Sequence, residues 1–463
     1  MKSFDVAVIG GGLLGCLAAR SLCRYELKTV LIEGQEDICR GISRANSAIV
    51  YPGYDNKPGS LKAQMTVRAN AYFDRLCDEL ELDFVRRGSL LLSYDEACDR
   101  VLEKKLRNGR ESGVPGLRML SGRQAVEMEP MLSAIPRMAL YCPGTGTVNP
   151  WQLGIAAYEN ALQNGCEAML GTSVLGIEKS GECYIIKSDR EEISCRAVIN
   201  CAGLFADKVR EMLFEPDVRL FWDASDFVVF DRNTPAPSTI LMQERPSGKG
   251  ISLVPTVEGS LLLEGPAREL RGELFSFRRE SREELLSEAQ SFVNGLREED
   301  IIRCFGAVRP NPRHVKKING EYVPDEKDIS SFVIDRPEPG FVSLIGIKTP
   351  GLSCADELGR HVAAAVAEYL GAEENRSFDP HRPAIKQLKG LDINARQKLI
   401  EQEKDYGEII CLCEGISKAE IKQAIARGAK SVEAVKRRLG TALGSCQGSR
   451  CNYAISKMLE VEK

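Results

Sequence analysis

The hydrophobic positions near the N-terminus form a short apolar run that ends in glycine. Residues 5–9 (Asp-Val-Ala-Val-Ile) are too few for a buried helix, so this run predicts a central parallel strand. Apolar residues at helical spacing follow from Leu13 to Cys23, and residues 28–32 form a second short run. Strand, helix and strand in this order predict a βαβ unit, the beginning of a doubly wound α/β domain.

Later hydrophobic segments indicate that this domain is interrupted. Two more short apolar runs, 197–201 and 341–345, each lead into glycine and then into a helical pattern. Between them, 227–230 and 260–264 resemble antiparallel strands and are bounded by turn signals. We therefore expect a discontinuous nucleotide-binding domain with an antiparallel domain inserted in it.

The length and charge of the chain limit how many domains it can form and which kinds of partner it can have. A chain of 463 residues is too long for one ordinary hydrophobic core, so we expect two or three domains. The formal net charge is -4, whereas nucleic-acid binders concentrate Lys and Arg on one face. We therefore expect no nucleic-acid partner, and we interpret the basic run 436–438 (Lys-Arg-Arg) as solvated helix surface.

The N-terminal residues and the cysteines bear on the compartment. From Met1 the chain enters the first apolar run without the features of a secretory signal. No window offers about 18 uninterrupted apolar residues, so we expect no transmembrane helix and leave only peripheral membrane contact open. The 16 cysteines are then expected to be reduced thiols in a cytoplasmic protein, most of them serving as small apolar residues.

A glycine motif lies between the first strand and the first helix. It fits the pattern G-x-G-x-x-G, and an acidic residue ends the next strand, which is the context that dinucleotide binding requires. The glycines permit a tight turn and a close approach of the backbone to a pyrophosphate, while the carboxylate would accept hydrogen bonds from the ribose. The motif alone does not separate NAD from FAD. The predicted contacts here are Gly10, Gly12, Leu13, Leu14, Gly15 and Glu33.

Several further segments resemble the D-amino-acid-oxidase-like FAD superfamily. Its nearest branches are L-2-hydroxyglutarate dehydrogenase and the catalytic subunit of anaerobic glycerol-3-phosphate dehydrogenase. The resemblance covers about residues 4–370 and implies FAD as the cofactor and a Rossmann-like FAD-binding fold. The segments that carry it are 43–55, 57–62, 200–203, 249–266 and 346–352.

The resemblance also implies which residues contact FAD. Arg44, Ala45, Asn46 and Ser47 would lie along the cofactor, the backbone of Val174 would pair with the adenine, and Ala202 and Gly203 would approach the pyrophosphate. Gly346, Lys348, Gly351 and Leu352 would cover the flavin ring, where main-chain amides stabilise the charge of the reduced flavin. A plain turn before the next helix is the alternative for this last segment.

One departure from the family pattern concerns the base and the cofactor linkage. The family usually carries a histidine where this chain has Tyr51. Oxidation of a secondary alcohol needs a group that takes the hydroxyl proton, and histidine is the commonest base. Tyr51 is therefore a candidate for holding a substrate carboxylate instead, and non-covalent FAD is expected because the histidyl link would fall on this position.

Two basic residues are candidates for binding a small anionic substrate. A guanidinium such as that of Arg309 pairs bidentately with carboxylate or phosphate, although arginine is also often a surface residue. Lys348 resembles a lysine of the phosphate-binding branch and favours a phosphorylated substrate or a stabilised flavin anion. We therefore expect glycerol 3-phosphate as the substrate, with L-2-hydroxyglutarate, another 2-hydroxy acid or an amino acid as competitors.

Four cysteines near the C-terminus form two closely spaced pairs. They resemble the bacterioferritin-associated-ferredoxin-like [2Fe-2S] domain that is appended to anaerobic glycerol-3-phosphate dehydrogenase subunits, and four thiolates can hold such a cluster. The same residue types would also hold zinc, which we keep as an alternative. The predicted ligands are Cys411, Cys413, Cys446 and Cys451.

Together these features predict an FAD-dependent dehydrogenase that transfers a hydride to the flavin N5 and passes electrons through the cluster. The acceptor would be a protein subunit or carrier, with an NAD(P)H-linked flavoprotein as one candidate. A non-catalytic electron-transfer subunit is the alternative. The expected fold class is α/β, a Rossmann-like FAD-binding domain (1–75, 145–215 and 300–371) interrupted by an antiparallel α+β substrate domain (76–144 and 216–299), then a linker (372–405) and a small helical [2Fe-2S] domain (406–463).

Overall fold

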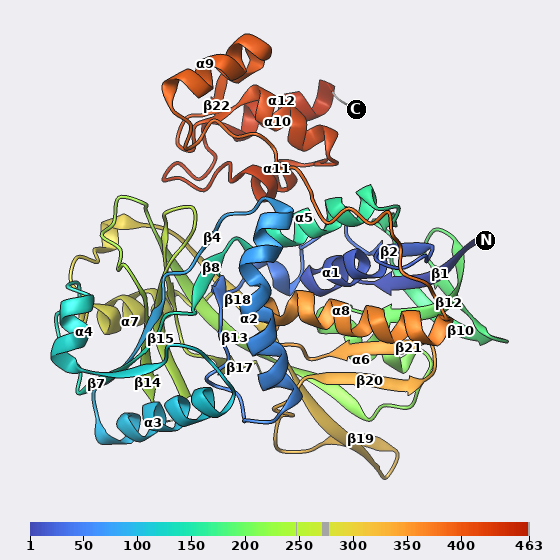
Figure 1. Ribbon diagram of the computed structural model, residues 1–463, viewed down its shortest axis with the longest axis horizontal. Coiled ribbons are helices and arrows are strands. Elements are labelled where there is room, and N and C mark those ends of the chain that lie inside the picture. The colour runs from blue at the N-terminus through green and yellow to red at the C-terminus, as the bar shows by residue number, and fades with distance from the viewer. Residues whose placement is uncertain (247, 271–276, 462–463) are drawn as a thin grey trace.

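The computed structural model describes residues 1–246, 248–270 and 277–461. Within them, the first sheet has eight strands and grows from the N-terminal βαβ unit, on the right of Figure 1. Strand β1 lies between β12 and β2, and all three run parallel. The strands are β1 (Lys2–Ile9), β2 (Thr29–Glu33), β9 (Glu167–Leu170), β10 (Val174–Ser180), β11 (Cys183–Ser188), β12 (Glu192–Asn200), β20 (Val333–Glu338) and β21 (Phe341–Ile345).

Helices cover this sheet and bury its main core. Helix α1 packs between α5 and α8, and Leu17, Ile199 and Leu358 belong to the shared hydrophobic cluster. A Cβ atom on Gly359 would lie 2.9 Å from the Leu17 backbone, so glycine lets α8 approach α1 closely. The helices around this sheet are α1 (Leu13–Leu22), α2 (Leu61–Leu80), α5 (Pro150–Gln163), α6 (Ala206–Glu211) and α8 (Gly351–Leu370).

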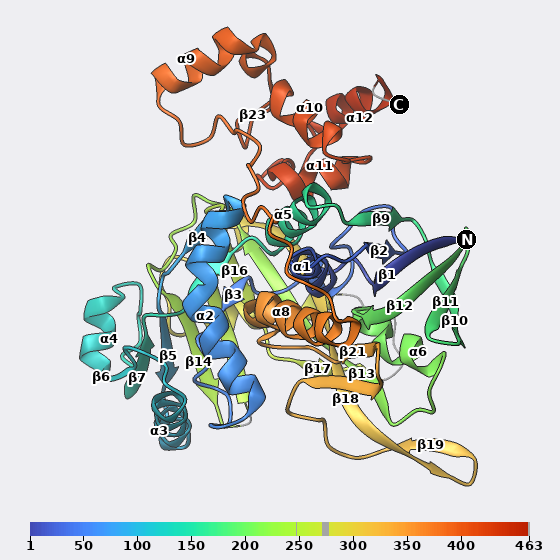
Figure 2. The ribbon, with the colours of Figure 1, turned by 45° about the vertical axis from the view of Figure 1, so that its right-hand side comes forward.

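A second, mostly antiparallel sheet forms the other half of the molecule (Figure 2). Ten of its strands lie in the described residues. They are β5 (Ser89–Ser93), β6 (Arg118–Ser121), β7 (Met138–Cys142), β13 (Val218–Phe230), β14 (Ile240–Arg245), β15 (Gly248–Pro255), β16 (Leu261–Glu264), β17 (Arg268–Glu269), β18 (Ile301–Ile318) and β19 (Glu321–Pro324). Helices α3 (Glu96–Glu111), α4 (Gly122–Met128) and α7 (Arg279–Gln290) accompany it.

One domain boundary differs from the expectation. We assigned residues 300–371 to the FAD-binding domain, but β18 and β19 belong to the second sheet. The reason is that β18 pairs with β13 along nearly its whole length, from Ile301 to His314. We therefore propose the same division with residues 301–324 moved to the substrate domain.

A small sheet joins the two halves. Strand β3 (Ile49–Val50) pairs with β8 (Gly146–Val148), which also pairs with β4 (Phe84–Val85). Tyr51 directly follows β3, and its backbone N–H donates to the Ser353 hydroxyl at 2.8 Å. This contact fixes the start of the segment that faces the candidate site.

The segment that we expected to be a linker is partly bound to the first half of the molecule. The buried Arg20 side chain donates to the Pro380 carbonyl at 3.1 Å, and Asn160 donates to the Asp379 carbonyl at 3.0 Å. Further on, the segment contains helix α9 (Ile393–Gln402). The chain therefore follows α1 and α5 before it enters the C-terminal domain, as Figure 1 shows.

The C-terminal domain packs its own hydrophobic cluster, which includes Ile421, Val435 and Ile455. A capping box begins α10, because the Ser417 hydroxyl accepts from the Glu420 backbone amide while the Glu420 carboxylate accepts from the Ser417 amide. The elements are β22 (Ile409–Cys411), β23 (Ile416–Ser417), α10 (Lys418–Ala426), α11 (Val432–Leu439) and α12 (Asn452–Val461).

The basic run in α11 is not solvated helix surface, so that interpretation is wrong. Lys436, Arg437 and Arg438 are only 4–5% exposed. They are buried because α11 packs against α5 of the first half, a contact visible in Figures 1 and 2. The local pattern gave no sign of this neighbour, which lies far away in the sequence.

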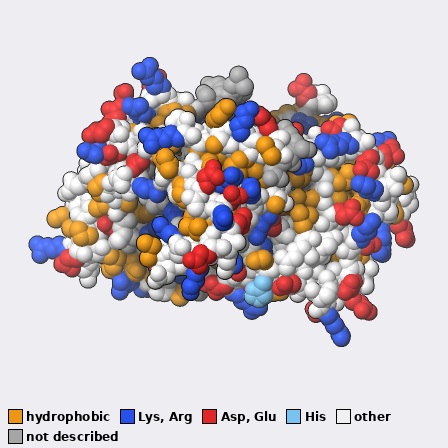
Figure 3. Space-filling model, turned by 90° about the horizontal axis from the view of Figure 1, so that it is seen from above, with side chains coloured by type: hydrophobic (Ala, Val, Ile, Leu, Met, Phe, Trp, Pro, Cys, Tyr) orange, Lys and Arg blue, Asp and Glu red, His pale blue; other side chains and the backbone are white. Residues whose placement is uncertain are grey.

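Charges of both signs are mixed on the face shown in Figure 3, where Lys and Arg side chains lie among Asp and Glu side chains. No single-sign patch dominates this face, in line with the small net charge. In the part of the chain that the structure describes, no helix is long and apolar enough to cross a membrane.

Candidate functional site

The glycine motif forms a tight turn from β1 into α1. Gly10 has a φ of +105°, which an L side chain rarely adopts, and a Cβ atom on Gly15 would lie 1.8 Å from the Gly10 carbonyl oxygen. The Glu33 carboxylate, at the end of β2, accepts from the Gly11 amide at 2.6 Å. The sequence pattern and the structure therefore agree on where this turn and its carboxylate lie.

The start of α1 suits a pyrophosphate. Its N-cap is Gly12, which has no side chain to cap the helix, and the Leu13 amide donates to the Ser43 hydroxyl at 2.8 Å. The first amide groups of a helix have no partner within it, and the helix dipole favours an anion at this end. The missing Cβ atoms leave room for close backbone approach, so these residues fit the dinucleotide that the motif predicts.

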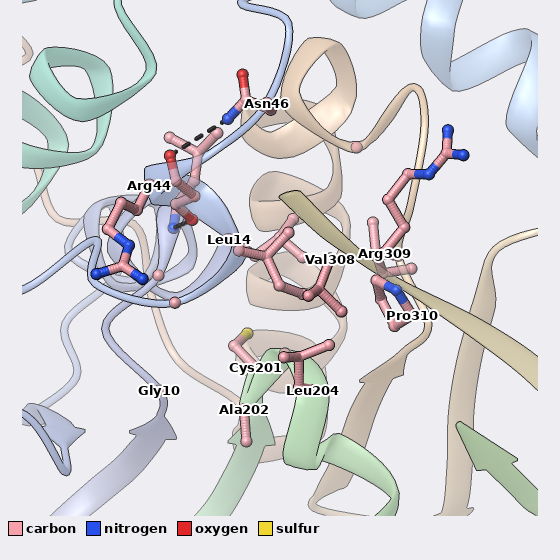
Figure 4. A pocket seen from close by; sticks show the side chains of 18 of the residues that line it. Gly10, Leu14, Arg44, Asn46, Cys201, Ala202, Leu204, Val308, Arg309 and Pro310 are labelled. Carbon is pink, nitrogen blue, oxygen red and sulfur yellow. Dashed lines mark hydrogen bonds between the residues drawn. The ribbon is translucent and has the colours of Figure 1, made fainter. Parts of the chain in front are cut away.

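A large cavity of about 700 Å³ begins at this turn and continues to the second sheet. Ser225 and Glu264 of that sheet line its far end. Figure 4 shows Arg44 and Arg309 on opposite sides of Leu14 and Val308. The predicted site residues that line the cavity are Gly10, Gly12, Leu13, Leu14, Glu33, Arg44, Ala45, Asn46, Ser47, Tyr51, Val174, Ala202, Gly203, Arg309, Lys348, Gly351 and Leu352.

Two predicted contacts do not line the cavity. Gly15 lies beneath the glycine turn, against the Gly10 carbonyl. Gly346 has a φ of +64°, and a Cβ atom there would meet the Pro312 ring at 2.6 Å. Both glycines therefore serve close packing that shapes the cavity wall.

At the far end, Tyr51 and Glu264 line the cavity, and both contact Lys249. The Lys249 ammonium lies 3.1 Å from the Tyr51 hydroxyl and 2.5 Å from the Glu264 carboxylate. Tyr51 and Glu264 are buried, whereas the Lys249 side chain is 31% exposed. Three polar groups thus meet beside the space where a substrate would lie.

The charges of this group follow from its contacts. Burial would lower the pKa of Lys249, but Glu264 and Tyr51 outweigh it and raise the pKa, so the ammonium stays protonated. Burial raises the pKa of Tyr51, although Lys249 acts in the opposite direction, so the phenol stays neutral. Tyr51 is therefore a hydrogen-bond donor at neutral pH, and Glu264 is the carboxylate that offers an acceptor.

The two predicted anion-binding residues differ in their surroundings. The Lys348 ammonium lies 3.1 Å from the Asp328 carboxylate and also contacts Asn311. By contrast, no carboxylate among the described residues lies within ion-pair distance of Arg309. Lys348 therefore already has a partner, and Arg309 is the better placed of the two to bind an anion in the cavity.

The four C-terminal cysteines lie in two pairs, and no three possible metal ligands are gathered closely around one point in the described residues. The sulfurs of Cys413 and Cys446 lie 3.4 Å apart, and burial together with the neighbouring Cys411 raises the pKa of the Cys451 thiol to about 12. The Gly448 amide, with the Cys413 thiol and nearby amides, lowers the pKa of the Cys446 thiol and so favours the thiolate. Two pairs of thiols suit a cluster of two irons that takes two ligands on each.

Sequence reasoning missed the roles of Lys249 and Glu264. Both residues fall in the segment 249–266 that carries the family resemblance, but nothing in their spacing links them to Tyr51. Lys249 is at the start of β15 and Glu264 at the end of β16, which pair side by side. Only the antiparallel pairing brings the two charges together.

Two family models match this chain. A model described as FAD dependent oxidoreductase matches residues 5–365, and a model described as BFD-like [2Fe-2S] binding domain matches residues 409–461. The expected cofactors, FAD and a [2Fe-2S] cluster, are confirmed at the level of the family, and the cluster takes precedence over the zinc alternative.

Curated relatives point in the same direction. The chain is 34% identical over 468 residues to glycerol 3-phosphate dehydrogenase of Caloramator mitchellensis, covering 99% of this chain and 94% of that protein. It is 25% identical to anaerobic glycerol-3-phosphate dehydrogenase subunit A1 of Haloferax volcanii, covering 100% and 83%. It is 28% identical to human mitochondrial L-2-hydroxyglutarate dehydrogenase, but over only 49% of this chain and 52% of that one.

Solved structures show the same fold. The FAD-bound L-alpha-glycerophosphate oxidase of Mycoplasma pneumoniae superposes with a TM-score of 0.73 at 21% identity, covering 82% of this chain and 99% of that one. A glycine oxidase from Geobacillus kaustophilus gives a TM-score of 0.68 at 19% identity, covering 82% and 97%. The chain therefore belongs to the FAD-dependent oxidoreductase family and ends in a BFD-like [2Fe-2S] binding domain.

Proposed function

We propose that this protein is a dehydrogenase that oxidises glycerol 3-phosphate and delivers the electrons to a protein acceptor. The full-length relationship to glycerol 3-phosphate dehydrogenase supports this substrate. The observation that carries the proposal is the group of Tyr51, Lys249 and Glu264 at the far end of the FAD cavity. It would supply a donor, a positive charge and a proton acceptor to a substrate bound in the cavity.

The side chains would divide the chemistry as follows. Oxidation of a secondary alcohol removes a hydride from carbon and a proton from the hydroxyl. Glu264 would accept that proton, Lys249 would hold the carboxylate in place, and the Tyr51 hydroxyl would donate a hydrogen bond to the substrate. Arg309 would pair with the phosphate. Bound FAD supplies the hydride acceptor, and the cluster supplies a one-electron relay.

A second substrate class, the 2-hydroxy acids and amino acids, is favoured by one observation. A neutral Tyr51, and an Arg309 guanidinium with no carboxylate within ion-pair distance among the described residues, would also suit a carboxylate. The half-length relationship to L-2-hydroxyglutarate dehydrogenase supports this alternative less than the full-length one supports glycerol 3-phosphate.

The partner and the compartment belong to the same proposal. We infer an electron-accepting subunit or carrier, with an NAD(P)H-linked flavoprotein as the candidate, because a one-electron relay suits a protein acceptor better than direct transfer to oxygen. A cytoplasmic location fits the reduced cysteines, since the structure has 16 free thiols and no disulfide in its described residues.

An anaerobic absorbance titration tests the proposed function. Glycerol 3-phosphate, L-2-hydroxyglutarate and amino acids are added in turn to the purified protein, and the flavin band is followed. Bleaching by glycerol 3-phosphate supports the proposal. Bleaching only by a 2-hydroxy acid or an amino acid would show that the substrate belongs to that class instead. If no compound bleaches the flavin, the non-catalytic electron-transfer subunit is favoured.

A further inference from the structure

The C-terminal domain contacts the FAD-binding domain through charges that are removed from water. Arg437 and Arg438 of α11 are 4% and 5% exposed, and Asp37 of the FAD-binding domain is 4% exposed. Arg438 forms two contacts with the Asp37 carboxylate, at 3.0 and 3.1 Å, and Arg437 contacts the same carboxylate. Among the described residues, Asp37 is the sole carboxylate within ion-pair distance of either guanidinium.

Asp37 lies in a segment that also frames the nucleotide end of the cavity. The segment follows Glu33, whose carboxylate accepts from the Gly11 amide. It ends at Cys39, whose amide donates to the Gly11 carbonyl at 2.8 Å. The segment that carries Asp37 is therefore hydrogen-bonded to the same glycine turn that is expected to bind the pyrophosphate.

Two more ion pairs cross between the domains at other places. Arg427, just after α10, lies 3.0 Å from Glu159 on α5. Arg232, in the loop after β13, contacts Glu414, the residue next to the cluster ligand Cys413. The C-terminal domain is thus bound to the FAD-binding domain at one end and to the substrate domain at the other.

We propose that Asp37, Arg437 and Arg438 form a buried latch that fixes the cluster domain in one position for electron transfer. The inference rests on the proposed function. With the latch closed, the two electrons of the reduced flavin would pass one at a time to the cluster and from there to the protein acceptor, the flavin proton would leave to solvent, and no domain movement would be needed. The three latch residues are positioning residues, because none of them is a ligand of either cofactor.

The physical reason for a latch is the asymmetry of buried ion pairs. A buried charge network that keeps all its partners is tolerated, whereas removal of one partner leaves charge buried without compensation. Replacement of Asp37 would leave the guanidinium groups of Arg437 and Arg438 buried without a carboxylate partner. The docked arrangement should then lose roughly a hundredfold or more in its equilibrium against the undocked one.

The test compares Asp37→Asn with the wild-type holoenzyme in stopped-flow absorbance under anaerobic conditions. Glycerol 3-phosphate is mixed with the protein, and flavin bleaching and cluster bleaching are followed separately. We expect flavin reduction at the wild-type rate and cluster reduction slowed by at least about tenfold, given the docking shift. The spectrum and reduction potential of the cluster should not change, because its ligands are untouched.

Small-angle X-ray scattering provides a second measurement that needs no substrate. We expect a larger radius of gyration for Asp37→Asn than for the wild type. If glycerol 3-phosphate fails to bleach even the wild-type flavin, the proposed function fails, and the scattering comparison still decides the latch.

The controls separate docking from general damage. Lys457→Gln removes an exposed ion pair within α12, to Glu460, and should leave both rates and the scattering unchanged. Arg438→Lys keeps the charge but loses the forked geometry, so it should show a smaller effect in the same direction and serves if Asp37→Asn does not fold with both cofactors. Cluster reduction at the wild-type rate with unchanged scattering in Asp37→Asn would overturn the latch.

Discussion

The Lys249 ammonium lies 3.1 Å from the Tyr51 hydroxyl, although the two residues are 198 positions apart in the sequence. The same ammonium holds the Glu264 carboxylate, so one side chain orients both the donor and the acceptor at the end of the cavity. Under the proposed function, this arrangement would take the place of a histidine base, because Tyr51 stands at the position where the family usually carries histidine.

Replacement of Lys249 tests this relationship. In Lys249→Met, Glu264 and Tyr51 lose their shared partner, and we expect kcat/KM for glycerol 3-phosphate to fall by roughly a hundredfold, the cost of a misplaced reacting geometry. FAD content should stay at the wild-type level. Steady-state kinetics with an artificial acceptor measures the loss, and Lys187→Met, which removes an exposed pair with Glu178, is the control. Unchanged kinetics in Lys249→Met would remove this group from the proposed chemistry.

Replacement of Glu33 tests the nucleotide end. The carboxylate accepts from the Gly11 amide and is expected to bind the ribose as well. Glu33→Gln should weaken FAD binding by about 1.5 to 3 kcal/mol, the range for a hydrogen bond to a charged group. Flavin fluorescence on dilution measures the affinity. The exposed neighbour Glu36 offers the control Glu36→Gln, which should bind FAD like the wild type.

Replacement of a cluster ligand tests the metal centre. Cys413→Ser should abolish the cluster absorbance and lower the iron from about two per chain towards zero, while FAD remains bound. Metal analysis and a visible spectrum measure both. Cys183→Ser, in a strand of the first sheet, should keep its iron. Zinc in place of iron in the wild type would contradict the assignment.

Acid precipitation tests the linkage of FAD. Tyr51 stands where the family carries histidine, so we expect no covalent bond between this position and the flavin. Denaturation in acid should leave the yellow flavin in the supernatant and a colourless pellet. A yellow pellet would show that another residue forms the bond.

Local pattern was sufficient for the nucleotide-binding end. Strand, glycine turn, helix and the carboxylate Glu33 lie within about one βαβ unit, so their spacing in the sequence fixes their arrangement in space. The two cysteine pairs of the sequence, 411/413 and 446/451, are each local, although the structure brings sulfurs of the two pairs together, Cys413 with Cys446. These parts of the site could be predicted because short-range geometry determines them.

Long-range contacts could not be predicted in the same way. Nothing in the segment around Lys249 indicates that its ammonium meets Tyr51, because that contact depends on how the second sheet packs against the first. The run 436–438 is polar and helical, and such a pattern usually faces water. It is buried because α11 packs against α5, and there Arg437 pairs with Asp37, which lies 400 positions away.

Residues 378–383 are bound to the FAD-binding domain, and this decides where the cluster domain can be separated from the rest of the protein. Phe378 lies 4.4 Å from the Arg24 guanidinium, and the Pro380 carbonyl accepts from Arg20, whose side chain is completely buried. A shortened protein that stopped at 371 would uncover Arg20 and leave its charge in a hollow open to water. A stable flavoprotein half should therefore extend to about residue 384, whose amide donates to Glu81. Ile385 and Leu388 already belong to hydrophobic clusters of the C-terminal domain, so the natural cutting point lies between residues 384 and 385.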